Sequence, residues 1–174
     1  MEFRFAEPGD EGLILEFVRE LAEYERAPEK VVADEALLRE EVFEKHHAEV
    51  LFVLRDGDAD VAASDDAGDA SGPRAGREVG FALFFHIFST WLGRAGIYLE
   101  DLFVKPEYRG RGYGKGLLTE LARIAVERGC GRLEWSCLNW NQPSIDFYLS
   151  LGAERMVDWT MFRLEGDTLE ALAE

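Results

Sequence analysis

The residues best placed to do chemistry lie between positions 97 and 116, where an apolar strand leads through Pro106 into a glycine-rich loop and then a helix. Gly110, Gly112 and Gly114 alternate with larger residues, and glycine lets a backbone approach a ligand closely and adopt left-handed conformations. Successive N–H groups in such a loop converge on an anion, and the first helical turn adds free donors and a positive dipole end. The segment therefore predicts a cradle for the pyrophosphate of a nucleotide cofactor.

The position of this loop in the chain separates it from other glycine-rich segments. Such loops are also common in solvent, but this one lies between a strand at 97–104 and an apolar helical pattern that includes Leu117 and Leu121. No Gly-Lys-Ser/Thr closes it, so it is not a Walker loop, and no GxGxxG follows the strand as a dinucleotide fold needs.

Two acids, Glu100 and Asp101, interrupt the apolar strand. Adjacent residues of a strand point to opposite faces, so we expect the two carboxylates to lie in different surroundings.

The remaining pattern predicts an α/β domain with a mixed central sheet of about seven strands and helices on both faces, in a single domain over residues 1–174. Strands are expected at 2–6, 49–55, 79–87, 97–104 and 132–138, with two more between 153 and 164. Asp10 and Asp34 are expected to cap two helices, and Asn141 to open a third. Residues 56–77 are small and acidic and predict a disordered hairpin insertion.

Composition narrows the choice of partners. The chain has 35 acids against 19 lysines and arginines and a net charge of −16, which disfavours nucleic acid and favours cationic substrates. Because only four of the bases are lysines, the surface also suggests adaptation to high salt, with a loss of stability on desalting. No apolar run approaches a membrane span and no export signal begins the chain, so a cytoplasmic protein is expected.

The cysteines and histidines predict no further chemistry. Cys130 and Cys137 fit reduced thiols in or near a core strand better than a disulfide or a metal pair. The histidines at positions 46, 47 and 86 lack a metal-like arrangement with other ligands, and we expect no metal.

Two motifs resemble a known family. Arg109, Gly112 and Gly114, following the sequence YLEDLFV, resemble the coenzyme A pyrophosphate motif of the GNAT superfamily of N-acetyltransferases. YLED at 98–101 and the downstream WNxPSxxFY are similar to the diamine (spermidine/spermine) and thialysine acetyltransferases, and the likeness extends from residue 3 to about 164. The downstream motif comprises Trp140, Asn141, Pro143, Ser144, Phe147 and Tyr148.

The resemblance implies a fold, a cofactor and residues that hold it. The fold is the GNAT fold, in which strands four and five splay apart and leave backbone groups free for the pantetheine arm of acetyl-CoA. The family also implies a homodimer. The residues assigned to the cofactor by this resemblance are Leu102, Phe103, Val104, Arg109, Gly110, Arg111, Gly112, Tyr113, Gly114, Lys115, Asn141 and Ser144.

The resemblance also implies catalytic roles. A primary amine of pKa about 10.4 must lose a proton before it attacks the thioester, which costs about 4 to 5 kcal/mol at pH 7. Glu100 is the candidate for accepting that proton, with Asp101 holding the cation, and Tyr148 is the candidate for protonating the leaving thiolate. Strand amides near Leu102 and Val104 can stabilise the oxyanion.

The acceptor side is less specific. By resemblance Tyr24, Glu25 and Trp91 line the substrate, although an exposed helix end and hairpin packing explain them equally well. The segment from Asp158, DWTMFRL, is closer to the thialysine branch, so a thialysine- or lysine-like amine is expected, with polyamines second. Asp158 is also expected to contact the substrate. A non-catalytic acetyl-CoA sensor and a protein acetyltransferase remain alternatives.

One position departs from the family. Relatives carry basic residues directly after the tyrosine, whereas Leu149, Ser150 and Leu151 follow Tyr148 here. The 3′-phosphate of coenzyme A must therefore rely on Arg109, Arg111 or Lys115, or be held weakly.

Overall fold

The computed structural model describes residues 1–55 and 77–174 of the chain. All but the last residue of the predicted insertion at 56–77 lie outside the described residues. The described chain forms two compact units, residues 1–136 and residues 137–174.

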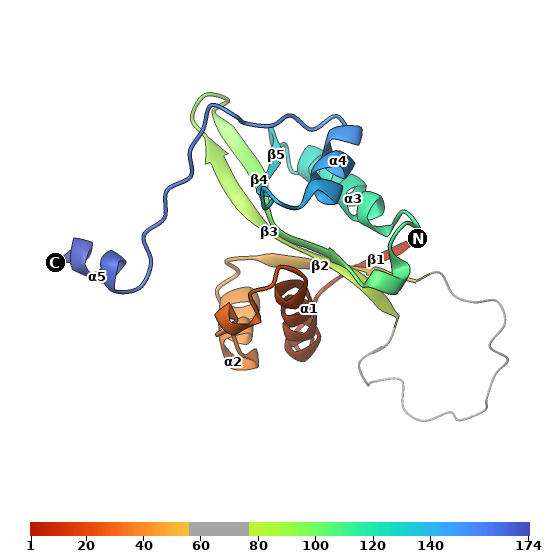
Figure 1. The fold of residues 1–174 in the computed structure, drawn as a ribbon, viewed down its shortest axis with the longest axis horizontal. Helices are drawn as coiled ribbons and strands as arrows, with labels where there is room; N and C mark the ends of the chain where they lie inside the picture. The colour runs from red at the N-terminus through yellow and green to blue at the C-terminus, as the bar shows by residue number, and fades with distance from the viewer. Residues whose placement is uncertain (56–76) are drawn as a thin grey trace, which may run out of the picture. The chain divides into compact units, whose positions relative to one another are not determined.

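The first unit is built on a five-stranded sheet (Figure 1). The strands lie in the sheet in the same order as in the chain. Strands β1 to β4 pair antiparallel with their neighbours, whereas β5 pairs parallel with β4. A mixed sheet of this kind confirms the predicted α/β class. The strands are β1 (Glu2–Phe5), β2 (Glu49–Leu54), β3 (Glu78–Ser89), β4 (Arg94–Val104) and β5 (Leu133–Trp135).

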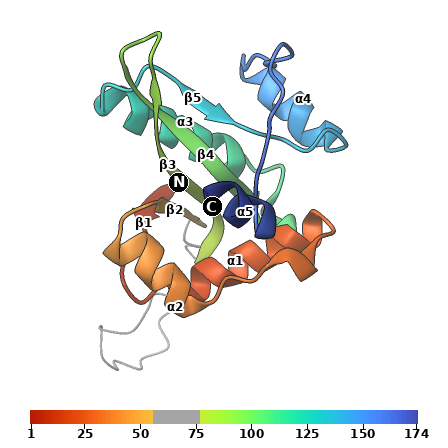
Figure 2. The same cartoon turned by 90° about the vertical axis from the view of Figure 1, so that its left-hand side faces the viewer.

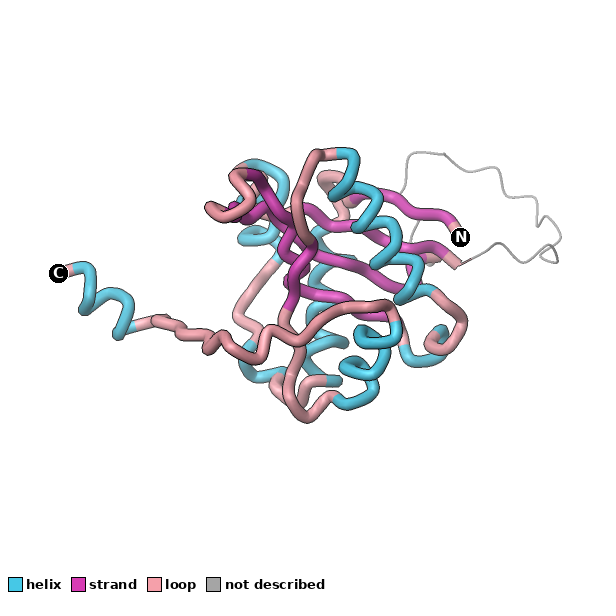
Figure 3. Tube along the Cα trace, turned by 90° about the horizontal axis from the view of Figure 1, so that it is seen from above, coloured by secondary structure: helices cyan, strands magenta, loops and turns pink. Residues whose placement is uncertain are grey.

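Helices cover both faces of the sheet, as predicted. Figures 1 and 2 show α1 (Glu11–Tyr24) beside α2 (Glu35–Leu38) on one face, and α3 (Tyr113–Glu127) lies on the other. Figure 3 shows the strands running side by side between these helices. The chain continues from α2 through a π-helical turn, Arg39–Glu44, and the short 3-10 turns Pro28–Lys30 and Pro106–Tyr108 follow α1 and β4.

The register explains the two halves of the core. Phe81 of β3 pairs with Phe103 of β4, and both pack with Phe17 of α1 in one buried cluster. Phe84 is three residues along β3 from Phe81 and therefore points to the opposite face, which α3 covers. Its partner Leu99 shares this face because the register of β4 shifts by one residue at Glu100.

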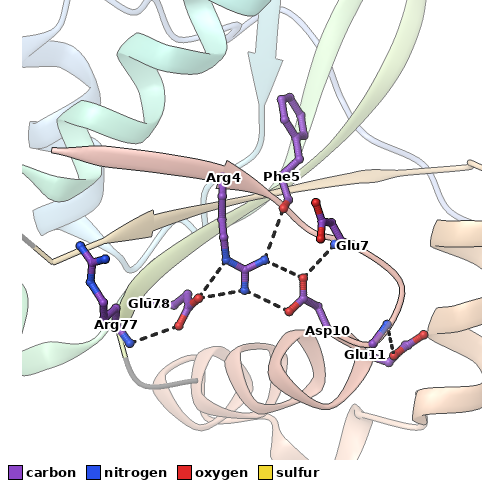
Figure 4. Close-up of polar contacts among 8 residues, drawn as sticks. Arg4, Phe5, Glu7, Asp10, Glu11, Arg77 and Glu78 are labelled. Carbon is purple, nitrogen blue, oxygen red and sulfur yellow. Dashed lines mark hydrogen bonds and ion pairs between the residues drawn. The ribbon is translucent and has the colours of Figure 1, made fainter. Parts of the chain in front are cut away.

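A polar network fastens the start of α1 to the sheet (Figure 4). Arg4 of β1 donates to both carboxylate oxygens of Asp10, at 2.7 and 3.0 Å, and from Nε to the buried Glu78 at 2.9 Å. Asp10 also accepts from the Glu7 N–H at 2.8 Å. Asp10 therefore precedes α1 as predicted. Its carboxylate, however, accepts hydrogen bonds from Arg4 and Glu7 and does not cap the helix. Asp34 does cap α2, by accepting from the Leu37 N–H at 2.8 Å.

The second unit contains α4 (Gln142–Ser150) and α5 (Asp167–Ala173). Asn141 caps α4 by accepting from the Ser144 N–H at 3.3 Å, as predicted from Asn141 with Pro143 in the first turn. No described helix is long and apolar enough to cross a bilayer.

Two predictions about the sheet were wrong. The described chain has five strands, since residues 153–164 form turns and irregular backbone in place of two strands. The strand predicted at 132–138 is also shorter, because pairing with β4 stops at Leu99 and Trp135. The next residue of β4, Glu100, belongs to an irregularity in the β3–β4 register, and such an irregularity bends a strand away from its neighbour.

Candidate functional site

A β-bulge separates the two acids of β4. Leu83 of β3 pairs with Asp101 and the next residue, Phe84, pairs with Leu99, so Glu100 is an extra residue without a partner on β3. Bulges re-aim the side chains around them. Glu100 is exposed, whereas Asp101 is half-buried on the α1 face of the sheet, two residues from the buried Phe103. The acids thus lie in different surroundings.

Asp101 has the most strongly perturbed carboxyl group of the site. Burial and, to a smaller extent, the nearby negative charges of Glu100 and Glu25 together raise its pKa to about 7. Burial also raises the pKa of Glu25. A carboxyl group with a pKa near 7 can exchange a proton at neutral pH.

The C-terminal end of α1 lies close enough to Asp101 to act on it electrostatically. Tyr24 is the last residue of α1 and Glu25 follows it, close enough to Asp101 for its charge to act there. Beside them runs an open groove of about 330 Å³ whose walls are mostly small and apolar. It is lined by Val18, Ala22, Glu25, Ala27, Lys30, Val31, Val32 and Ala33.

Lys30 is the candidate residue that sequence reasoning missed. It and Glu25 are the charged side chains of the groove lining, and they have opposite signs. No motif marks Lys30, because the groove arises only when residues 27–33 fold back beside Val18 and Ala22 of α1.

The far end of β4 runs beyond its described pairing with β5, and there the Val104 carbonyl already accepts a hydrogen bond from Arg109. Leu102, Phe103 and Val104 pair with β3 on one side, but β5 pairs only with residues 97–99 of β4. Residues 102–104 therefore extend past the described part of β5. This is the arrangement that a diverging β4/β5 pair requires.

The glycine loop fits a pyrophosphate. Gly110 and Gly112 have φ values of +73° and +90°, in the left-handed region that favours glycine, and no atom lies within 4 Å of a Cβ added at either. Gly112 immediately precedes α3, so Tyr113, Gly114 and Lys115 form its first turn and their N–H groups have no partner within the helix. Open backbone at the start of a 15-residue helix is a suitable anion cradle.

Arg109, the first residue of this loop, lies against α1. Its Nε donates to the Val104 carbonyl at 2.9 Å. Its guanidinium carbon lies 4.6 Å from the ring centroid of Tyr24 and 5.2 Å from that of Phe103. Arg111 behaves differently, because its guanidinium lies over Tyr108, 5.5 Å from the ring centroid.

Within the first unit, Trp91 lies far from Glu100 and Asp101. It lies in the turn between β3 and β4, where it is 89% exposed. Asp101 is seven residues along β4 from Arg94, the first residue after that turn, which corresponds to about 20 Å of strand.

The other predicted residues belong to the second unit. Asn141 is buried and holds the start of α4 through Ser144, and Tyr148 lies on the same helix with its ring 5.3 Å from that of Phe147. Asp158 is exposed in a turn after α4.

Comparison with known proteins gives a consistent result. Residues 16–153 match the model of the Acetyltransferase (GNAT) family. A thialysine N-epsilon-acetyltransferase of Bos taurus is 38% identical over 98% of this chain and 95% of its own. An L-ornithine N5-acetyltransferase of Arabidopsis thaliana is 44% identical over 53% of this chain and 41% of its own. An integron cassette protein from V. cholerae superposes with a TM-score of 0.75, at 27% identity, over 99% of this chain and 97% of its own.

Proposed function

The chain belongs to the GNAT family of acetyltransferases, and from that premise we propose that it acetylates the terminal amine of a small amino acid resembling lysine or thialysine. The observation that carries the proposal is Asp101, a half-buried acid with a pKa of about 7 that feels the charge of Glu25, and Glu25 lines a groove together with one base, Lys30. A protonated amine needs a proton acceptor of this kind before it can act as a nucleophile.

The two acids of β4 would divide the work. Asp101 accepts the proton from the amine at its carboxylate, because its raised pKa makes it a better base than an ordinary aspartate. Glu100, on the bulge, contributes a negative charge that keeps this pKa high and attracts the cation. This reverses the roles expected from the family resemblance, and comparing the Asp101→Asn and Glu100→Gln variants decides between the two assignments.

The GNAT family uses acetyl-CoA as its donor, which supplies an activated acetyl thioester. In this chain the main chain of Leu102 and Val104 would hold the pantetheine arm. The open glycine backbone at 110–112 and the first turn of α3 would hold the pyrophosphate. Tyr148 as proton donor to the thiolate sulfur stays a prediction, as do Asn141 and Ser144 as ligands of the arm.

The groove favours an amino acid over a polyamine. An amine that binds beside Asp101 and Glu25 can extend its alkyl stem along Ala22 and Val31 and place a carboxylate near Lys30. A polyamine would instead bring a second cation toward Lys30. Thialysine and ornithine, the substrates named for two relatives, both carry an α-carboxylate and a terminal amine.

The test is release of free thiol from acetyl-CoA with matched acceptors. Thialysine, lysine and ornithine are compared with cadaverine, the decarboxylated form of lysine, and with spermidine. The proposal predicts a kcat/KM for the best amino acid at least tenfold above that for its decarboxylated analogue. Equal or higher values for cadaverine and spermidine would favour the polyamine alternative. Binding of acetyl-CoA without turnover of any small amine would instead support a sensor or a protein acetyltransferase.

We also propose a homodimer. In the second unit Trp159, Met161 and Phe162 are 66–90% exposed, a level unusual for neighbouring apolar side chains in a monomer. Light scattering coupled to size exclusion should give twice the mass of 19.7 kDa, and a monomer at micromolar concentration would refute this.

A further inference from the structure

Arg109 makes three contacts that lead away from the glycine loop. Its Nε is hydrogen-bonded to the carbonyl of Val104, the last residue of β4, and its guanidinium lies against the rings of Tyr24 and Phe103. Tyr24 is the last residue of α1, so one side chain connects the end of β4 to the end of α1.

Glu25, the residue after Tyr24, acts electrostatically on Asp101. Glu25 is among the charges that raise the pKa of Asp101, and this influence depends on where the end of α1 lies. A side chain that fixes Tyr24 therefore also fixes the distance from Glu25 to Asp101.

We propose that Arg109 is a positioning residue for the acceptor side of the site, in addition to any contribution its charge makes to cofactor binding. It holds Tyr24 against β4, and thereby keeps Glu25 beside Asp101 and the groove correctly formed. The inference rests on the proposed function for its kinetic consequences, but not for its structural ones.

Arginine is suited to this task in a way that lysine is not. A planar guanidinium can donate a hydrogen bond from Nε and stack on an aromatic ring at the same time, whereas an ammonium is a compact point charge. Arg109→Lys therefore preserves the charge near the loop but loses the combined contact. Arg109→Met removes both.

The first experiment measures proton binding in the free protein. The carboxyl carbon of Asp101 is titrated by NMR in the wild type, Arg109→Met, Arg109→Lys and Tyr24→Leu, with no cofactor or amine present. All three variants should lower the pKa of Asp101 from about 7, because Glu25 is no longer held beside it. An unchanged pKa in all three variants would overturn the proposal whether or not the protein acetylates an amine.

The second experiment separates the two substrates kinetically. Arg109→Lys and Tyr24→Leu should each raise the KM for the amine roughly threefold to tenfold, and Tyr24→Leu should leave the KM for acetyl-CoA within about twofold of the wild type. Arg111→Met is the matched control, because it removes a loop charge that lies over Tyr108. It should raise the KM for acetyl-CoA and spare that for the amine.

Combining the variants gives the final criterion. If Arg109 acts through Tyr24, Arg109→Met with Tyr24→Leu should raise the amine KM by less than the product of the two single effects. Two results would show that Arg109 acts only on the cofactor. In one, the amine KM of the double variant rises by the full product of the two single effects; in the other, Arg109→Lys has the wild-type amine KM. A wild-type protein that turns over no amine would refute the proposed function and leave the NMR result to decide the positioning role.

Discussion

The two compact units differ in what covers their apolar side chains. In residues 1–136, Phe17, Phe52 and Phe81 are fully buried between the sheet and α1. In residues 137–174, Ile145 is buried, but Trp159 and Phe162 are 68% and 90% exposed. The first unit therefore has its own core and can hold Asp101 and Arg109 in defined surroundings, whereas these two apolar side chains of the second unit are largely exposed.

This contrast predicts different kinds of defect. Substitutions in the first unit should change proton binding, pH dependence and substrate choice, because those properties depend on surroundings that the unit itself provides. Substitution of Tyr148 in α4 should change turnover alone.

The largest expected effect comes from the buried acid of the first unit. Asp101→Asn should lower kcat/KM for the amine at least 100-fold at pH 7, because the proton acceptor is lost. In the wild type kcat/KM should rise with pH up to about 7 and then level off, since the acid must be ionised to act as a base. The variant should lose this dependence.

Glu100→Gln is the comparison for Asp101→Asn. It should keep a rising pH profile with a midpoint below that of the wild type, because one of the charges that raise the pKa of Asp101 is gone. A larger loss of activity in Glu100→Gln than in Asp101→Asn would restore Glu100 as the proton acceptor.

The next effect tests the second unit. Tyr148→Phe should lower kcat about tenfold to 100-fold, because the departing thiolate would lose its proton donor. Calorimetric affinity for acetyl-CoA and the KM for the amine should both stay within about twofold of the wild type. An unchanged kcat would show that Tyr148 is not the proton donor. A change in both affinities would show that the second unit also controls substrate binding, which contradicts the proposed difference between the units.

Substrate choice should respond to the groove. Lys30→Glu should lower kcat/KM for thialysine relative to cadaverine about tenfold, since a carboxylate would face an acid in place of a base. Lys45→Glu is the matched control, because it makes the same change in net charge at a lysine that pairs with Glu40 and Glu41 and does not line the groove. If the ratio of kcat/KM for thialysine to that for cadaverine is unchanged in Lys30→Glu, Lys30 does not bind the substrate carboxylate.

Local patterns predicted the parts of the fold that depend on neighbouring residues. Asp10 and Asp34 marked where two helices begin, and three glycines between a strand and a helix identified the loop. Features that depend on distant segments were missed. Two strands were expected between residues 153 and 164, but a strand also needs a partner, and the described chain supplies none there.

The site shows the same limit. That the two acids would differ followed from strand alternation, but which acid would be buried depended on the bulge at Glu100, which arises from the register of β3 against β4. The pairing of Arg109 with Tyr24 links residues 85 positions apart and leaves no mark in either motif.

The smallest expected effect is on stability, and it distinguishes a functional acid from a structural one. The pKa of Asp101 is raised from 3.8 to about 7, so its ionisation favours unfolding, and stability is lost as the pH rises through this window. The shift corresponds to at most about 4 kcal/mol, and partial solvent exposure should reduce this to about 2 kcal/mol.

Asp101→Asn should therefore stabilise the protein while it inactivates it. At pH 8 its Tm should exceed that of the wild type by about 4 to 8 °C, and by less than half as much at pH 5, where Asp101 is largely protonated in the folded state. Glu107→Gln, at an exposed acid before the loop, should show no such pH-dependent gain. Destabilisation by Asp101→Asn at both pH values would mean that the carboxylate helps to hold the fold. The apolar core alone would then not account for the stability of the first unit.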